Sequence, residues 1–164
     1  MALTIEDGTG IAGANSYITV EDAQGYADLR GLSVTITEAL LIKACDYLES
    51  LRGDYQGEKT DGDNALQWPR SGVTVDGFDI GTDEIPDILI RAQAQLACDA
   101  ATVDLMPNGT GREIIATSVE GAVTVQYAAS GDTAPQPDLT AARALIAPLL
   151  RTANRGGSLR SFRV

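Results

Sequence analysis

Apolar residues recur at helical spacing in two windows of the chain, and helix-start and helix-breaking residues mark two more, so the sequence predicts four helices. The windows are Val20 to Leu29, Thr37 to Gly53, Ile85 or Pro86 to Pro107, and Thr140 to about Thr152. Thr19 with Asp22 and Thr37 with Glu38 are typical of helix N-termini, whereas Pro148 should kink or split the last helix.

Period-two alternation marks a different element between the third and fourth windows. Glu113 to Val119 and Ala122 to Ala128 are rich in β-branched residues and flank Glu120-Gly121, which predicts a β-hairpin. A lone hairpin is barely stable in water, so its apolar face must rest on helices or on a partner. We expect Val123, Val125 and Tyr127 to form part of a subunit interface.

Residues 53–84 lack either pattern and are rich in Gly and Asp, which predicts a long ordered loop with at most one short strand. The least generic string in it is Trp68-Pro69-Arg70-Ser71-Gly72. One interpretation is a lone Trp that anchors the loop on the core. The other places Trp68 and Arg70 at a subunit contact, because Trp and Arg are enriched at interface centres.

These elements define an α+β fold that is mainly α: a small bundle of about four helices, a two-stranded antiparallel hairpin and a long ordered loop. The 164 residues fit one domain. We divide the chain into an N-terminal arm (1–16), a helical domain with the hairpin at about 113–128 (17–152) and a basic tail (153–164). The Gly-rich stretch Gly8 to Gly13 is interpreted as part of a loosely held arm rather than as a phosphate cradle.

Charge is divided unevenly along the chain, whose net charge is -11. Residues 1–138 hold all 23 acidic residues, whereas residues 139–164 hold five arginines and no acid. An acidic body repels nucleic acid, and a basic segment favours phosphates or an acidic protein surface. Leu159, Phe162 and Val164 lie between the arginines and favour a docking peptide.

Composition argues against catalysis. The sequence has no histidine, which removes the commonest general base, the usual triads and most zinc sites, so we expect no enzyme, metal or cofactor. Asp61 and Asp63 fail the calcium-loop pattern, since the sixth and twelfth positions are Leu66 and Gly72. Cys45 and Cys98 are expected to be buried free thiols. Neither a secretory signal nor a membrane-length apolar run is present, so we expect the protein in the cytosol or in an assembly.

Four strings, in this order, resemble a group of phage proteins labelled DnaT-like single-stranded DNA-binding proteins, which are similar in size and layout to head-tail connectors. The strings are Asn15 to Ala23, Ala44 to Leu48, Leu66 to Val73, and Ile85-Pro86. The resemblance spans roughly residues 14–130, and its most specific part is Trp68 to Gly72.

The resemblance implies a structural head-to-tail adaptor in the virion neck, present in the host cytoplasm before assembly. About 12 copies would form a ring between the portal protein and a downstream neck or tail-completion protein, and DNA would pass through the lumen without specific binding. For such an adaptor we expect portal contacts from Arg151, Arg155, Leu159, Arg160, Phe162 and Arg163. The alternative is a single-stranded DNA-binding replication protein that uses the same arginines.

Overall fold

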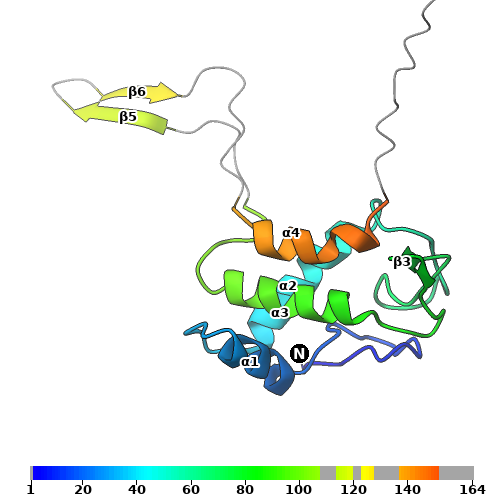
Figure 1. The fold of residues 1–164 in the computed structure, drawn as a ribbon. Helices are drawn as coiled ribbons and strands as arrows, with labels where there is room; N and C mark the ends of the chain where they lie inside the picture. Colours follow the sequence, from blue (N-terminus) through cyan, green and yellow to red (C-terminus); the bar gives the residue numbers. More distant parts are fainter. Residues whose placement is uncertain (1, 108–113, 120–122, 128–136, 152–164) are drawn as a thin grey trace, which may run out of the picture.

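Four helices form the body of the protein in the computed structural model, which describes residues 2–107, 114–119, 123–127 and 137–151. Helix α3 (Asp87–Asp99) lies at the centre and packs against α1 (Val20–Leu29), α2 (Glu38–Ser50) and α4 (Thr140–Ile146), as Figure 1 shows. Short antiparallel strand pairs accompany the helices. The predicted α+β class with a helical bundle is therefore confirmed. No helix in the described parts of the chain is long and apolar enough to cross a membrane.

The predicted starts of α1 and α2 are confirmed by their caps. The Thr19 hydroxyl accepts a hydrogen bond from the backbone N–H of Asp22 (3.1 Å), and the Thr37 hydroxyl accepts one from Leu40 (3.4 Å). Each bond satisfies a donor that the first turn of a helix leaves unpaired.

Two helices end earlier than the sequence predicts. Helix α3 stops at Asp99 rather than near Pro107, and the Thr102 hydroxyl donates to the carbonyl of Asp99 (3.2 Å). Helix α4 stops at Ile146, and a 3₁₀ turn, η1 (Ala147–Leu149), carries Pro148. The expected split at Pro148 is confirmed, because proline cannot donate the next helical hydrogen bond.

The long loop contains more strand than the sequence predicts. Strand β1 (Glu58–Lys59) pairs with β2 (Arg70–Ser71), and β3 (Thr74–Val75) pairs with β4 (Phe78–Asp79), both antiparallel. The β3–β4 turn is Asp76-Gly77, with φ of 53° and 85°. Two consecutive positive φ values suit the short hairpin turn that such pairs favour. Strands of two residues give no readable alternation, which is why the pattern missed them.

The predicted hairpin is present as β5 (Ile114–Val119) and β6 (Val123–Tyr127), paired antiparallel with Val119 opposite Val123. Figure 1 shows the two strands set apart from the four helices. Side chains of these strands lie outside what the structure describes.

The N-terminal segment is more firmly held than expected. Ile5 pairs with Ser16 in a parallel bridge, and the carboxylate of Glu6, 1% exposed, accepts backbone N–H bonds from Gly8, Gly10 and Ile11 (2.7–2.9 Å). The glycine-rich turn thus encloses an anion supplied by the chain itself. Gly8 has φ 105° and an added Cβ there would lie 1.9 Å from the Asp83 carbonyl oxygen, so a glycine is required.

The core is made mostly of Leu, Ile, Val and Ala from all four helices, together with Tyr55 and Trp68 from the long loop. Cys45 and Cys98 are buried in it as free thiols, as predicted. The loop therefore forms one wall of the bundle.

Candidate functional site

Three residues meet in the body, and two of them, Tyr17 and Trp68, belong to the strings that carry the family resemblance. The Tyr17 hydroxyl donates to Oε1 of Glu49 (2.7 Å), and the backbone N–H of Trp68 donates to the Tyr17 hydroxyl (3.3 Å). The backbone N–H of Gln67 donates to the same Glu49 oxygen (3.2 Å). We call Tyr17, Glu49 and Trp68 the loop clamp, because they fix the long loop to α2 and to the segment before α1.

Burial sets the protonation behaviour of the clamp. It raises the pKa of Glu49, although the hydrogen bonds from Tyr17 and Gln67 act in the opposite direction. Burial also raises the pKa of Tyr17, and the neighbouring Glu49 carboxylate adds to this effect. The pair is thus a partly buried acid beside a phenol that stays protonated, and the hydrogen bond between them holds the segment before α1 to α2.

Gln93 makes a second buried connection, from the centre of α3. Its Oε1 accepts from the backbone N–H of Tyr17 (2.8 Å), and its Nε2 donates to the Ser16 hydroxyl (2.9 Å) and to the Leu41 carbonyl (3.0 Å). Every polar atom of this fully buried amide that can bond has a partner. Gln93 therefore ties α2, α3 and the N-terminal segment together.

Arg70 ties two parts of the long loop together. The guanidinium donates from Nε to the Gln56 carbonyl (2.8 Å) and from a terminal nitrogen to the Gly57 carbonyl (2.9 Å). Its carbon centre lies 5.7 Å from the Tyr55 ring centroid, and that ring meets Trp68 edge-on with centroids 5.6 Å apart. The peptide bond before Pro69 is cis.

Trp68 and Arg70, proposed above for a subunit contact, are 0% and 4% exposed. The structure assigns both an internal role, and Trp68 anchors the loop on the core. Their role at a subunit contact stays a prediction. The side chains of Val123, Val125 and Tyr127 lie outside the described residues, so their interface role also stays a prediction.

Arg151 marks the point where the C-terminal segment leaves the body. Its backbone N–H donates to the Asp54 carbonyl (2.6 Å) and its Nε donates to the Tyr55 carbonyl (2.9 Å). Leu150 also bridges Tyr55. Of the residues expected to bind a portal, Arg151 thus contacts the loop of its own chain, whereas Arg155, Leu159, Arg160, Phe162 and Arg163 lie outside the described residues.

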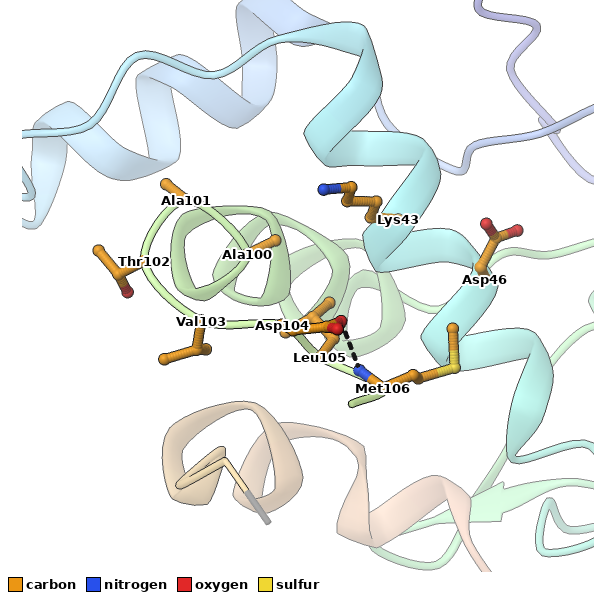
Figure 2. Close-up of a pocket in the computed structure, with 9 residues that line it drawn as sticks. All are labelled: Lys43, Asp46, Ala100, Ala101, Thr102, Val103, Asp104, Leu105 and Met106. Atoms are coloured by element: carbon orange, nitrogen blue, oxygen red, sulfur yellow. Dashed lines mark hydrogen bonds between the residues drawn. The ribbon is translucent and has the colours of Figure 1, made fainter. Parts of the chain in front are cut away.

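An open groove of about 500 Å³ lies between α2 and residues 100–106. Figure 2 shows Lys43 and Asp46 on its α2 side and Met106 reaching toward them, with the backbone N–H of Met106 donating to Asp104 (3.1 Å). Val103 and Met106 are 39% and 45% exposed. The groove offers one cation, two carboxylates and a partly apolar floor, without a nucleophile held against a base.

A smaller hollow, about 220 Å³, lies beside the β3–β4 turn. It is lined by Val75, Ile80, Glu84, Pro86, Asp87 and Ile88. Phe78, on β4, is 76% exposed. We call this hollow together with Phe78 the Phe78 patch.

The described surface offers few aromatic rings for stacking on nucleic-acid bases, and partly exposed Tyr26 carries Arg30 at 3.6 Å from its ring centroid. Tyr17, Tyr47, Tyr55 and Trp68 are buried, so among residues 2–107 and 137–151 Phe78 is the one strongly exposed aromatic ring. Arg91 faces Asp87 at 3.7 Å. Single strands need a basic groove with stacking rings. No group of three or more Cys, Asp or Glu side chains within the described ranges could hold a metal ion.

Glu49, Gln93 and Glu6 were not singled out from the sequence. Two of them carried a signal: Glu49 lies four residues after buried Cys45, and Gln93 lies four after buried Leu89. A polar residue at an apolar-face position of a helix indicates a buried hydrogen-bond network. Glu6 had no such periodic context.

Comparison with known proteins gives one match. A family model described as "Putative DnaT-like ssDNA binding protein" matches residues 1–164. No curated protein and no solved structure matches the chain. Because the family model covers the whole chain, this protein belongs to the DnaT-like ssDNA-binding protein family.

Proposed function

We propose that this protein is a structural adaptor of a tailed phage, which assembles as a ring between the portal and the next neck protein. The observation that carries the proposal is the β5–β6 hairpin, which lies apart from the helices of its own chain (Figure 1). A two-stranded hairpin alone is marginally stable. A neighbouring subunit in a ring would supply cover for the apolar face of the hairpin.

The distribution of charge supports the proposal that DNA passes through the ring without binding to it. All 23 acidic residues precede residue 139, and 19 of them lie among residues 2–107. A ring of such bodies would present a negative wall, and repulsion at that wall would let DNA slide without sticking. The phage identity itself rests on the four resembling strings, two of which contribute to the loop clamp.

The portal contact is assigned to the tail. Residues 153–164 contain Arg155, Arg160 and Arg163 with Leu159 and Phe162 between them. Arginine pairs bidentately with carboxylates, and an aromatic ring supplies an apolar anchor. The anchored exit at Arg151 gives this tail a fixed starting point on the body.

Attachment to heads tests the proposal. Portal-containing heads of the phage that encodes the protein are incubated with the full chain or with residues 1–153, and bound protein is measured after sedimentation. The full chain should co-sediment with the heads and the truncated chain should not. Arg52→Ala, a change of an exposed body arginine, is the matched control and should bind like the full chain. Equal binding by the truncated chain would overturn the assignment of the tail.

Single-stranded DNA binding is the second candidate, and the description of the matching family favours it. The same tail arginines would bind phosphates, and binding would weaken steeply with salt. Titration of a labelled oligonucleotide at two salt concentrations separates the candidates. Tight, salt-sensitive binding that is lost in residues 1–153 supports the DNA-binding function, whereas no binding at moderate salt supports the adaptor.

A further inference from the structure

The Phe78 patch combines an apolar hollow with an exposed aromatic ring on the outer half of the long loop. Val75, Ile80 and Ile88 line the hollow and are each only partly buried. Phe78 stands beside it with 76% of its surface exposed. An exposed ring of this size next to an apolar hollow is typical of a surface that binds something.

Carboxylates dominate the border of the patch, and Arg91 lies 3.7 Å from one of them, Asp87. Residues 71–90 contain five carboxylates and no basic residue: Asp76, Asp79, Asp83, Glu84 and Asp87. All five are exposed. Glu84 and Asp87 line the hollow itself. A complementary occupant is therefore a short segment with several cations and at least one apolar anchor.

The chain's own C-terminal segment has this chemistry and starts next to the patch. Gln56 joins the two places: its Nε2 donates to the Pro148 carbonyl in η1 (2.7 Å), and its Oε1 accepts from the backbone N–H of Thr74 in β3 (3.4 Å). Residues 152–164 then follow Arg151, with three arginines, Leu159 and Phe162, and no acid.

The segment after Arg151 is long enough to reach the patch. A chain extends by roughly 3.3 Å per residue, so the segment after Arg151 can span tens of ångströms. A tethered segment of this length has an effective concentration of the order of millimolar at nearby sites. Weak individual contacts are then sufficient for occupancy within one molecule.

We propose that residues 154–164 dock on the Phe78 patch of the same molecule, with Phe162 in the hollow and Arg155, Arg160 and Arg163 facing the carboxylates around it. The docked tail is withheld from other acidic surfaces and from phosphates until a partner competes for it. The proposal goes beyond the adaptor function, and its test uses the isolated protein, so its failure leaves the attachment experiment unaffected.

Backbone amide NMR spectra of the full chain and of residues 1–153 test the docking. At about 0.1 M salt, deletion of the tail should shift the amide signals of Val75, Phe78, Ile80 and Ile88. More than half of that difference should vanish at about 1 M salt, where the screening length falls from about 10 Å to about 3 Å. Phe162→Ala in the full chain should reproduce most of the deletion, and the matched control Leu29→Ala, an exposed apolar residue on α1, should not.

Three outcomes overturn the proposal. Unchanged patch signals after deletion mean that the tail does not dock there. Changes at Val103 and Met106 instead place it in the groove of Figure 2. Shifts that grow with protein concentration, with a matching rise in sedimentation coefficient, mean that the occupant is the tail of a second copy.

Discussion

The two halves of the long loop between α2 and α3 behave in opposite ways. In the first half, Tyr55, Trp68 and Arg70 are at most 4% exposed and are held by the clamp and by backbone carbonyls. In the second half, the β3–β4 turn presents Phe78 at 76% exposure among exposed carboxylates. One loop thus closes the core at one end and offers a surface at the other.

This difference separates the string that carries the family resemblance from the exposed surface of the same loop. The most specific string, Trp68 to Gly72, lies in the buried half, where its side chains support the fold. The outward half carries no comparable string, yet it holds the apolar and charged groups that a partner could recognise. The recognisable motif therefore marks residues that support the fold, and residues that contact other molecules are expected outside it.

The largest contrast is expected between Trp68→Ala and Phe78→Ala. Removing the fully buried indole should lower the free energy of unfolding by about 3–5 kcal/mol, because a large cavity replaces packed ring atoms. Removing the exposed ring should change it by less than about 0.5 kcal/mol. Urea unfolding of both variants measures the contrast, and similar losses would remove the distinction between the two halves.

Gln93→Ala should be the next largest change, because it strips partners from the Tyr17 N–H, the Ser16 hydroxyl and the Leu41 carbonyl. The buried Tyr17 N–H would lose its partner, although the Ser16 hydroxyl keeps its bonds to Ile18, and the three lost bonds should cost about 2–3 kcal/mol. Gln95→Ala is the matched control, since Gln95 bonds only partly buried or exposed partners, Tyr26 and Asp99. Equal unfolding midpoints for the two variants would contradict the role of Gln93.

Arg70→Lys tests whether the fork geometry rather than the charge holds the buried half. Lysine keeps the charge but cannot reach the Gln56 and Gly57 carbonyls together, so we expect a loss of about 1–2 kcal/mol. Arg52→Lys, on the exposed surface, should be neutral in the same unfolding assay. A neutral Arg70→Lys would show that the loop needs only a cation there.

Glu49→Gln should change the free energy of unfolding only slightly, and the change should depend on pH. Burial raises the folded-state pKa of Glu49, so its contribution to stability is complete below about pH 4.3 and is lost as pH rises through the folded-state pKa. Glutamine can still accept from Tyr17 and Gln67 without that loss. The free energy of unfolding of the variant, relative to that of the wild type, should therefore increase as pH rises toward neutrality.

Asp7→Asn should show the opposite pH dependence of stability. The Thr9 hydroxyl and N–H lower the pKa of Asp7, so this carboxylate stabilises the fold above its unfolded pKa, and the wild type should gain on Asp7→Asn as pH rises. Parallel pH trends in the two variants would contradict the account of Glu49.

The helices could be predicted because their signals are local. Thr19 and Thr37 cap helices where the sequence placed them, and the apolar stripes of α2 and α3 face the core. Strands β1 to β4 could not be predicted, because two residues are too few to show an alternation of polar and apolar positions. The hold on the N-terminal segment depends on the bonds from Glu6 to nearby backbone N–H groups, which follow no periodic pattern, and on the packing of Gly8 against Asp83, which is far away in sequence.

The candidate site was predictable only in part. Trp68 and Arg70 stood out as residue types, but their inward orientation follows from tertiary contacts with Tyr17, Tyr55 and Gly57. Phe78 gave no signal, because a single aromatic residue in a polar loop is equally compatible with an anchor and with an exposed ring.

We propose that the protein forms a structural ring in the virion neck. Negative-stain imaging of purified virions with an antibody against the helical body, residues 17–107, tests it most directly. The account predicts label at the junction of head and tail in intact particles. Particles that lack the protein, together with recovery of the protein on single-stranded DNA from infected cells, would contradict it.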